Sequence, residues 1–159
     1  LTVMVGSEAS AYHMALPLME CYAKSVRRMG PAGAGQLTKM VNQICIAGLL
    51  QGLSEGIHFA ERAGLNVSSA MEVITQGAAQ SWQMDNRAET MIAGDFDFGF
   101  AVDWMRKDLG FAIDEAEKND IPLPVTKLVD GYYKQIQENG GGRQDTSALI
   151  TLLNKRSKQ

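Results

Sequence analysis

The chain has 159 residues, of which 45% are hydrophobic and 21% charged, and its formal net charge is −3. This length suffices for one ordinary domain with a buried core, and no apolar run approaches the roughly 20 residues that a membrane span needs. The negative charge excludes a broadly basic surface, so we expect a cytoplasmic globular protein that binds neither nucleic acid nor a membrane.

The first thirty residues predict a strand, a helix and a second strand. Residues 1–5 are apolar and partly β-branched, and Gly6 ends them. Apolar residues at helical spacing predict a helix from Glu8 to about Tyr22, which Pro17 should bend or restart. Met14 is one of these residues and is predicted to lie in a core. Residues 25–29 form the second short strand. Because a two-stranded fragment is not stable alone, we expect it to pack on something larger.

A long helix is predicted from Leu37 to Ala63, which would measure about 40 Å at ~1.5 Å per residue. It has no proline, it carries a continuous apolar stripe, and Gly64 can end it. Small side chains recur on it every four residues, at Gly48, Gly52, Gly56 and Ala60. Because glycine destabilises a helix, this ridge predicts that another helix crosses there at close range.

Shorter helices are predicted in the rest of the chain. Ser69 and Glu72 have the spacing of a capping box, and Ser81 and Gly94 can begin and end the next helix. Three further helices are predicted over 101–118, over 125–137, and from a cap at Asp145 or Thr146 to about Lys155. The two cysteines, Cys21 and Cys45, are too few for a disulfide scaffold and are predicted to be reduced core residues.

The segment 30–43 is the first candidate for chemistry. Its three glycines permit a tight turn, and Lys39 should follow in about the first turn of the long helix. The helix dipole disfavours a cation there, which suits a lysine that acts as a general acid or base. Asn42 and Gln43 lie on the same helical face. The alternative is a glycine-rich linker followed by a solvated lysine, and the glycine order does not match a dinucleotide-binding loop.

The segment 94–109 is the second candidate. Phe96, Phe98 and Phe100 alternate along it before a run of charges. If Lys107 and Asp108 face a cleft, they can bind a phosphate, amide or carboxylate. The alternative is an aromatic anchor followed by a surface ion-pair network. The two histidines, His13 and His58, lack ligand-spaced neighbours, so no metal site is expected.

Together the two segments resemble the β-hydroxyacid dehydrogenase family. The resemblance rests on Gly30-x-x-Gly33-x-Gly35-x-x-x-Lys39-x-x-Asn42-Gln43 and on Phe100 with Asp103-x-x-x-Lys107-Asp108-Leu109. Members include 3-hydroxyisobutyrate dehydrogenase, tartronate semialdehyde reductase and, more distantly, 6-phosphogluconate dehydrogenase. The resemblance implies a mainly α fold: a helical domain over 30–159, like the C-terminal domain of 6-phosphogluconate dehydrogenase, with a long central helix. A βαβ remnant of a Rossmann domain precedes it over 1–29.

The family's activity is hydride transfer between NAD or NADP and a small β-hydroxy acid of the 3-hydroxyisobutyrate or tartronate semialdehyde type. The resemblance implies that Lys39 is the catalytic acid or base. It also implies substrate-binding residues, namely Asn42, Gln43 and Phe100, and cofactor-binding residues, namely Lys107 and Asp108.

The family's glycine fingerprint and its serine-glycine-glycine substrate loop are missing from this sequence. The resemblance therefore implies a fragment that is inactive alone, with NAD or NADP held mainly by an absent N-terminal domain. It also implies a small hydroxy acid as substrate, and a homodimer or homotetramer. The alternative function is a non-catalytic helical scaffold or oligomerisation module derived from the same fold, against which the retained Lys39, Asn42 and Lys107 argue.

Overall fold

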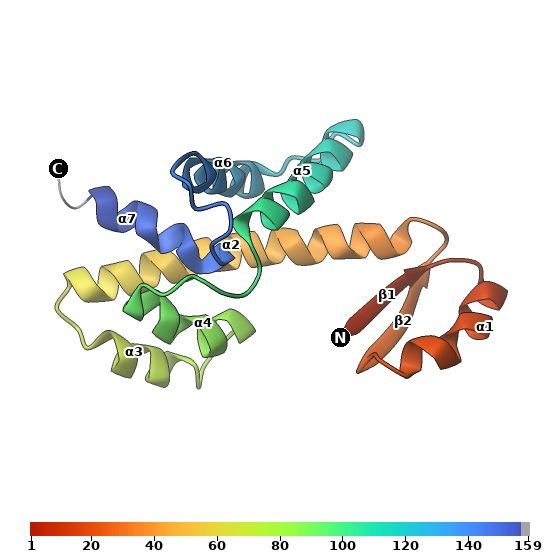
Figure 1. The fold of residues 1–159 in the computed structure, drawn as a ribbon, viewed down its shortest axis with the longest axis horizontal. Coiled ribbons are helices and arrows are strands. Elements are labelled where there is room, and N and C mark those ends of the chain that lie inside the picture. Colours follow the sequence, from red (N-terminus) through yellow and green to blue (C-terminus); the bar gives the residue numbers. More distant parts are fainter. Residues whose placement is uncertain (157–159) are drawn as a thin grey trace. The chain divides into compact units, whose positions relative to one another are not determined.

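The computed structural model describes residues 1–156, and side chains as far as residue 154. It consists of two short strands and a series of helices (Figure 1). The chain divides into two compact units, Leu1–Ile44 and the part from Cys45 onward, and the boundary falls within one helix. The elements are β1 (Thr2–Gly6), α1 (Ala9–Glu20), β2 (Ser25–Gly30), α2 (Ala34–Arg62), α3 (Val67–Ile74), α4 (Trp82–Ala93), α5 (Val102–Lys118), α6 (Pro124–Glu138), the 3₁₀ helix η1 (Thr146–Ile150) and α7 (Thr151–Arg156). The predicted division into two domains after residue 29 stays a prediction.

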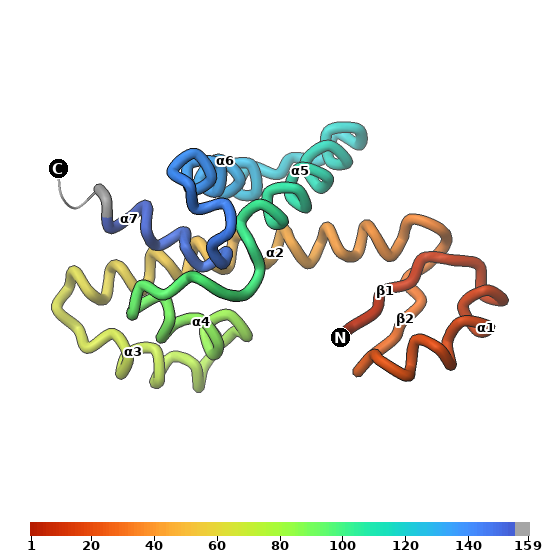
Figure 2. The backbone as a smooth tube through the Cα atoms, in the orientation of Figure 1, coloured from red at the N-terminus to blue at the C-terminus, as the bar shows by residue number. Residues whose placement is uncertain are grey.

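In the first unit, β1 and β2 pair in parallel, with Val3 opposite Val26. The backbone runs from β1 through α1 and returns to β2 (Figure 2). Pro17 lies inside α1, so the helix does not restart there, which was one of the two predicted effects of this proline. Proline already has a helical φ and removes only one backbone donor, and the helix ends three residues later.

Two glycines let the start of α2 pack directly on the end of β1. A Cβ added to Gly6 would lie 2.6 Å from the carbonyl oxygen of Pro31 and 2.8 Å from the backbone nitrogen of Ala34. A Cβ added to Gly35 would collide with the carbonyl oxygen of Met4. Any larger residue would separate the two backbones, so these glycines fix the point from which α2 leaves the sheet.

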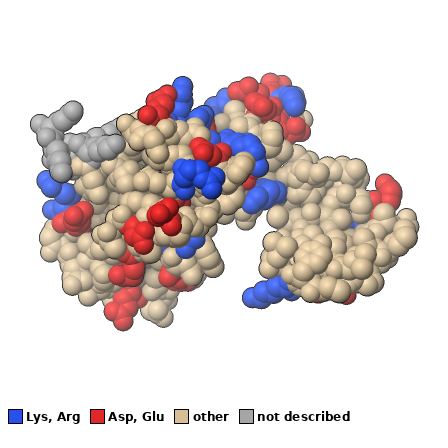
Figure 3. Space-filling model, in the orientation of Figure 1, with Lys and Arg blue, Asp and Glu red and all other residues tan. Residues whose placement is uncertain are grey.

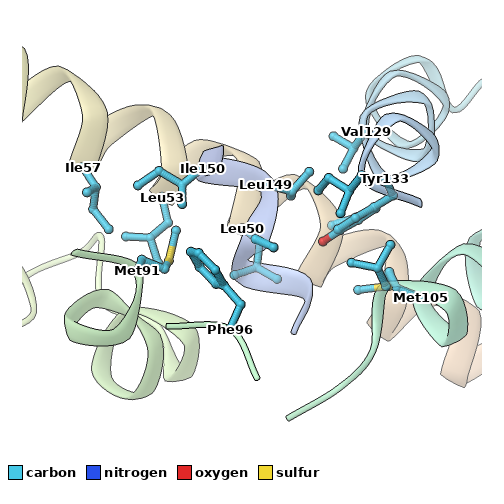
Figure 4. Close-up of a cluster of buried hydrophobic side chains, with 14 of the residues drawn as sticks. Leu50, Leu53, Ile57, Met91, Phe96, Met105, Val129, Tyr133, Leu149 and Ile150 are labelled. Atoms are coloured by element: carbon cyan, nitrogen blue, oxygen red, sulfur yellow. The ribbon is translucent and has the colours of Figure 1, made fainter. Parts of the chain in front are cut away.

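The second unit has a hydrophobic core to which most of its helices contribute. Figure 4 shows buried side chains from the continuation of α2, from α4 to α6 and from η1 meeting one another. The labelled members are Leu50, Leu53, Ile57, Met91, Phe96, Met105, Val129, Tyr133, Leu149 and Ile150. This core fixes α5, which carries one set of candidate functional residues.

Helix caps account for where two of the shorter helices begin. Ser81 caps α4 as predicted, accepting a hydrogen bond of 3.0 Å from the backbone nitrogen of Met84, and Gly94 ends that helix with a φ of +73°. The predicted start at Ser69 is wrong. Asn66 is the cap of α3 instead, because its side chain accepts a 2.9 Å hydrogen bond from the backbone nitrogen of Ser69.

The ridge of small residues on α2 is not crossed by a helix as predicted. Around Gly52 and Gly56, a Cβ would meet no atom of the described chain within 4 Å. At Gly48 it would meet only Val125 of α6, at 3.7 Å. The prediction of close helix crossing is therefore wrong for most of the ridge, because α6 reaches only its first member.

Several residues predicted to be buried are exposed. Cys21 and Cys45 are free thiols at the surface, so their prediction as core residues is wrong. In the first unit, Met14 is 78% exposed and Leu18 is 72% exposed. Figure 3 shows a mainly uncharged surface on the drawn face of this unit. Helical periodicity identifies the apolar face of α1. The two strands and one helix of this small unit do not offer enough surface to bury that face.

None of the helices within residues 1–156 combines the length and the hydropathy needed to cross a lipid bilayer. In the same part of the chain, no group of three histidine, cysteine or acidic side chains is arranged to hold a metal ion.

Candidate functional site

Three polar residues lie together on the first turns of α2, in the first unit. Lys39 is exposed, and its Nζ donates a hydrogen bond of 3.0 Å to Oε1 of Gln43. The side-chain nitrogen of Asn42 donates to the same oxygen at 2.8 Å. Gln43 itself is only 1% exposed. A fixed, neutral acceptor therefore orients two exposed donors without adding a charge beside the lysine.

Lys39 lies further into the helix than expected. Because α2 begins at Ala34, Lys39 is in its second turn, and the effect of the helix dipole falls off within the first turn. The hydrogen bond to Gln43 is thus a local feature that places this ammonium group, and the helix dipole is not.

Phe100 lies between α4 and α5 in the second unit, and its backbone is held on both sides. Its N–H donates a 2.9 Å hydrogen bond to Oδ2 of Asp145, and its carbonyl oxygen accepts one of 3.0 Å from the N–H of Thr146. Phe100 as a whole remains 39% exposed. A partly exposed aromatic side chain on a fixed backbone can serve as one wall of a binding site.

Lys107 and Asp108 are neighbours on α5. Nζ of Lys107 lies 3.2 Å from Oδ1 of Asp108 and 5.4 Å from the ring centre of Trp104. The side chain of Lys107 is 50% exposed and that of Asp108 only 14%. Lys107 can therefore meet an anionic or polar ligand, while the less exposed carboxylate and the indole ring hold it in place.

These contacts bring the predicted site residues together in three sets. Lys39, Asn42 and Gln43 form the set in the first unit. The second unit contains the pair Lys107 and Asp108, and Phe100 with the carboxylate that holds its backbone.

The sequence did not predict the role of Asp145 beyond a helix cap. Its carboxylate is 1% exposed and accepts hydrogen bonds from Nε of Arg87 at 3.2 Å and from the N–H of Phe100 at 2.9 Å. It also caps η1 through Ser147. The capping spacing was visible in the sequence. Arg87 is 58 residues away in the chain, so no local pattern could have indicated it.

A second polar network ties α5 to α6. The guanidinium of Arg106 makes two hydrogen bonds to Asp130, at 3.0 and 3.1 Å, and one to Gln137 at 2.6 Å. The hydrogen bond to Asp130 raises the pKa of Arg106 against the opposing effect of burial. A two-point contact of this kind fixes the orientation of both side chains, and it lies next to Lys107 in the sequence.

Comparisons with known proteins place this geometry in context. The family model described as NAD-binding of NADP-dependent 3-hydroxyisobutyrate dehydrogenase matches residues 33–153. An uncharacterized oxidoreductase of Shewanella frigidimarina is 56% identical over 155 residues, which are 98% of this chain and 53% of that protein. The 2-(hydroxymethyl)glutarate dehydrogenase of Eubacterium barkeri is 31% identical over 153 residues, 96% of this chain and 51% of that enzyme.

Among solved structures, the crystal structure of 3-hydroxyisobutyrate dehydrogenase from Salmonella typhimurium superposes with a TM-score of 0.82 at 32% identity. The match covers 92% of this chain and 52% of that one. The chain thus spans about half the length of the relatives that it matches.

The family match corrects the predicted fold class. The helical region was expected to be a domain like the C-terminal domain of 6-phosphogluconate dehydrogenase, separate from the part that binds the dinucleotide. That assignment is wrong, because the model that matches residues 33–153 is described as NAD-binding. The prediction placed most of the cofactor binding in an absent Rossmann domain and left only Lys107 and Asp108 to the helices, whereas the matched region is built of helices.

The predicted cofactor class, NAD or NADP, agrees with the matched family. The match covers well over half of the chain, and relatives in the comparison carry the names of oxidoreductases and dehydrogenases. This chain belongs to the NAD-binding family of NADP-dependent 3-hydroxyisobutyrate dehydrogenase.

Proposed function

We propose that this chain forms part of an NAD(P)-dependent dehydrogenase of a small β-hydroxy acid, of the 3-hydroxyisobutyrate or tartronate semialdehyde type. The observation that carries the proposal is the exposed ammonium of Lys39, held at 3.0 Å by the buried amide of Gln43. In a chain of this family, such a group suits proton transfer at a hydroxyl oxygen. The names of the relatives, which include a hydroxy-acid dehydrogenase, support the same class of reaction.

Lys39 is proposed to be the general acid and base. When a hydroxy acid is oxidised, neutral Nζ accepts the hydroxyl proton as the C–H bond breaks and its hydride leaves. When the carbonyl compound is reduced, the ammonium returns that proton to the oxygen. NAD(P), when bound, accepts or supplies the hydride. Gln43 keeps Nζ in position, and Asn42 and Gln43 are proposed as substrate-binding residues of the first unit. Phe100 is proposed as a substrate-binding residue of the second unit.

The residues of this chain fit a dinucleotide at Lys107 rather than at Gly6 and Gly35. The space beside Gly6 and Gly35 is filled by backbone atoms, so these two glycines do not form a phosphate cradle. Lys107 presents a half-exposed cation beside Trp104, which can bind a phosphate or a carboxamide oxygen. Asp108 holds that lysine, and we propose this pair as the chain's contribution to cofactor binding.

A homodimer or homotetramer is proposed as the assembly.

The test is turnover of a panel of 3-hydroxy acids with NAD and NADP, in the full-length protein that contains this chain. We expect Lys39→Ala to lower kcat by about 10²–10⁴-fold, the usual contribution of a positioned acid or base. Lys39→Arg should be similarly slow, because arginine keeps the charge but does not release its proton. Lys24→Ala removes another exposed lysine of the first unit and is the matched control.

Undiminished turnover in Lys39→Ala would refute the catalytic role. Titration calorimetry with NADPH separates the proposed enzyme from a helical scaffold. Binding to the full-length protein supports the enzyme, and its absence at millimolar concentrations supports the scaffold.

A further inference from the structure

The backbone of Phe100 rests on a buried carboxylate. Oδ2 of Asp145 accepts the N–H of Phe100 at 2.9 Å, while Oδ1 accepts the backbone N–H of Ser147 at 3.0 Å and its hydroxyl at 2.6 Å. The carboxylate is 1% exposed. Because buried acceptors with several donors hold one position, the place of Phe100 depends on where Asp145 stands.

Gly99 allows this close approach. Its φ is +72°, and a Cβ at this position would collide with Oδ2 of Asp145. Only glycine combines that backbone conformation with the missing side chain. The loop before α5 therefore lies directly against the carboxylate, with no side chain between them.

Arg87 of α4 fixes the other side of the carboxylate. Its Nε donates to Oδ1 of Asp145 at 3.2 Å. Its guanidinium lies 4.9 Å from the ring centre of Trp82 and 5.0 Å from that of Phe98. A side chain that is only 18% exposed, paired with a carboxylate and in contact with two aromatic rings, has little freedom to move.

We infer that Asp145 is a positioning residue that, together with Arg87, sets the place of Phe100 against the substrate. The inference rests on the proposed function, which makes Phe100 a substrate-binding residue. Asp145 is proposed to touch neither the substrate nor the cofactor and to act through the backbone of Phe100. If the carboxylate moves, Phe100 moves with it, and substrate binding weakens while cofactor binding stays the same.

Asp145→Asn breaks this link selectively. Three donors converge on Oδ1, so the amide oxygen of asparagine is expected to take that place. The amide nitrogen then faces the N–H of Phe100, where two donors oppose each other. Amide hydrogen exchange at Phe100 should become faster, and this readout does not depend on activity.

Two glycines offer a matched pair for the kinetic test. Gly94 and Gly99 have φ values of +73° and +72°, so alanine has to adopt a left-handed φ at each. At Gly94 the added Cβ meets nothing within 4 Å among the described residues, whereas at Gly99 it meets Asp145. A difference between the two variants therefore reports the contact with the carboxylate.

The experiment measures KM for the hydroxy acid, Kd for NADPH and amide exchange in the full-length protein. We expect Gly99→Ala and Asp145→Asn to raise KM between about 10-fold and 100-fold, the range for a displaced substrate contact. NADPH affinity and the KM of Gly94→Ala should stay within about twofold of the parent protein. Combining Asp145→Asn with Phe100→Ala should raise KM no further than Phe100→Ala alone.

The remaining outcomes of this experiment contradict either the positioning role of Asp145 or the substrate role of Phe100. Equal KM values for Gly99→Ala and Gly94→Ala, additive effects in the double variant, or unchanged amide exchange at Phe100 would overturn the positioning role. If Phe100→Ala leaves KM unchanged, the proposed substrate role of Phe100 fails instead. The exchange measurement then still decides whether Asp145 holds the loop.

Discussion

Lys39 donates a hydrogen bond from Nζ to Oε1 of Gln43, one helical turn further along α2, over 3.0 Å. The acceptor is almost fully buried and the donor is exposed. The hydrogen bond restrains the flexible lysine side chain at Nζ, while the residue as a whole remains exposed. This is the arrangement expected of a group that must meet a small substrate in a repeatable position.

Replacing the neutral acceptor by a carboxylate tests this arrangement. In Gln43→Glu, a negative charge lies beside Nζ and favours its protonated form. Oxidation of the hydroxy acid needs neutral Nζ, so Gln43→Glu should slow the oxidation at a fixed pH by about 10-fold. Gln135→Glu adds the same charge at an exposed position of α6 and serves as control. An unchanged rate of oxidation in Gln43→Glu would argue against proton transfer by Lys39.

The start of α3 gives a second prediction, on stability. Asn66→Ala removes the side chain that accepts the N–H of Ser69, and should lower the free energy of unfolding by about 1 kcal/mol. Ser69→Ala keeps the backbone donor and should change that energy by less than about 0.5 kcal/mol. Chemical denaturation of both variants decides between the two caps. A larger loss in Ser69→Ala would restore the capping box predicted from the sequence.

Features that depend on neighbouring residues could be predicted from the sequence. The bounds of α4 follow from Ser81 and Gly94, which supply its cap and its left-handed end. The contact between Lys39 and Gln43 follows from their spacing of four residues on a helix. In these cases the interacting groups lie within one or two turns, so the local pattern contains the required information.

Features that depend on distant residues could not be predicted. The position of Phe100 is set by Asp145, 45 residues further on, and the position of Asp145 by Arg87, 58 residues earlier. The prediction of which residues are buried failed for a related reason. Met14 has the right spacing for a core residue but is 78% exposed, because periodicity shows which face is apolar and not what covers it.

The core of the second unit gives a third prediction. Leu50 is 1% exposed within the cluster drawn in Figure 4, whereas Leu128 on α6 is 54% exposed. Leu50→Ala should lower the free energy of unfolding by about 2–5 kcal/mol, because it loses buried contacts and leaves a cavity. Leu128→Ala removes the same atoms and should cost less than about 1 kcal/mol. If Leu50→Ala and Leu128→Ala have equal midpoints in chemical denaturation, this cluster does not stabilise the fold.

Tyr133 is expected to make the stability of the second unit depend on pH in the alkaline range. It is fully buried, and its hydroxyl donates to the carbonyl oxygen of Thr146 at 3.2 Å. Burial, aided by the charge of Asp145, raises the pKa of Tyr133 above its ordinary value of 10.0. Above pH 10 the unfolded chain has lost this proton while the folded chain still holds it. The stabilising contribution of Tyr133 to the free energy of unfolding is therefore fully present below pH 10 and is lost as the pH rises further.

The expected loss is about 1.4 kcal/mol per pH unit for one proton, in the range above pH 10. Tyr133→Phe removes the hydroxyl that carries this proton. Above pH 10, the free energy of unfolding of this variant should therefore fall with pH less steeply than that of the parent protein, by about 1.4 kcal/mol per pH unit. Tyr132→Phe changes the adjacent, partly exposed tyrosine and should keep the steep dependence. Parallel curves for Tyr133→Phe and the parent protein between pH 10 and about 11 would show that this hydroxyl does not govern alkaline unfolding.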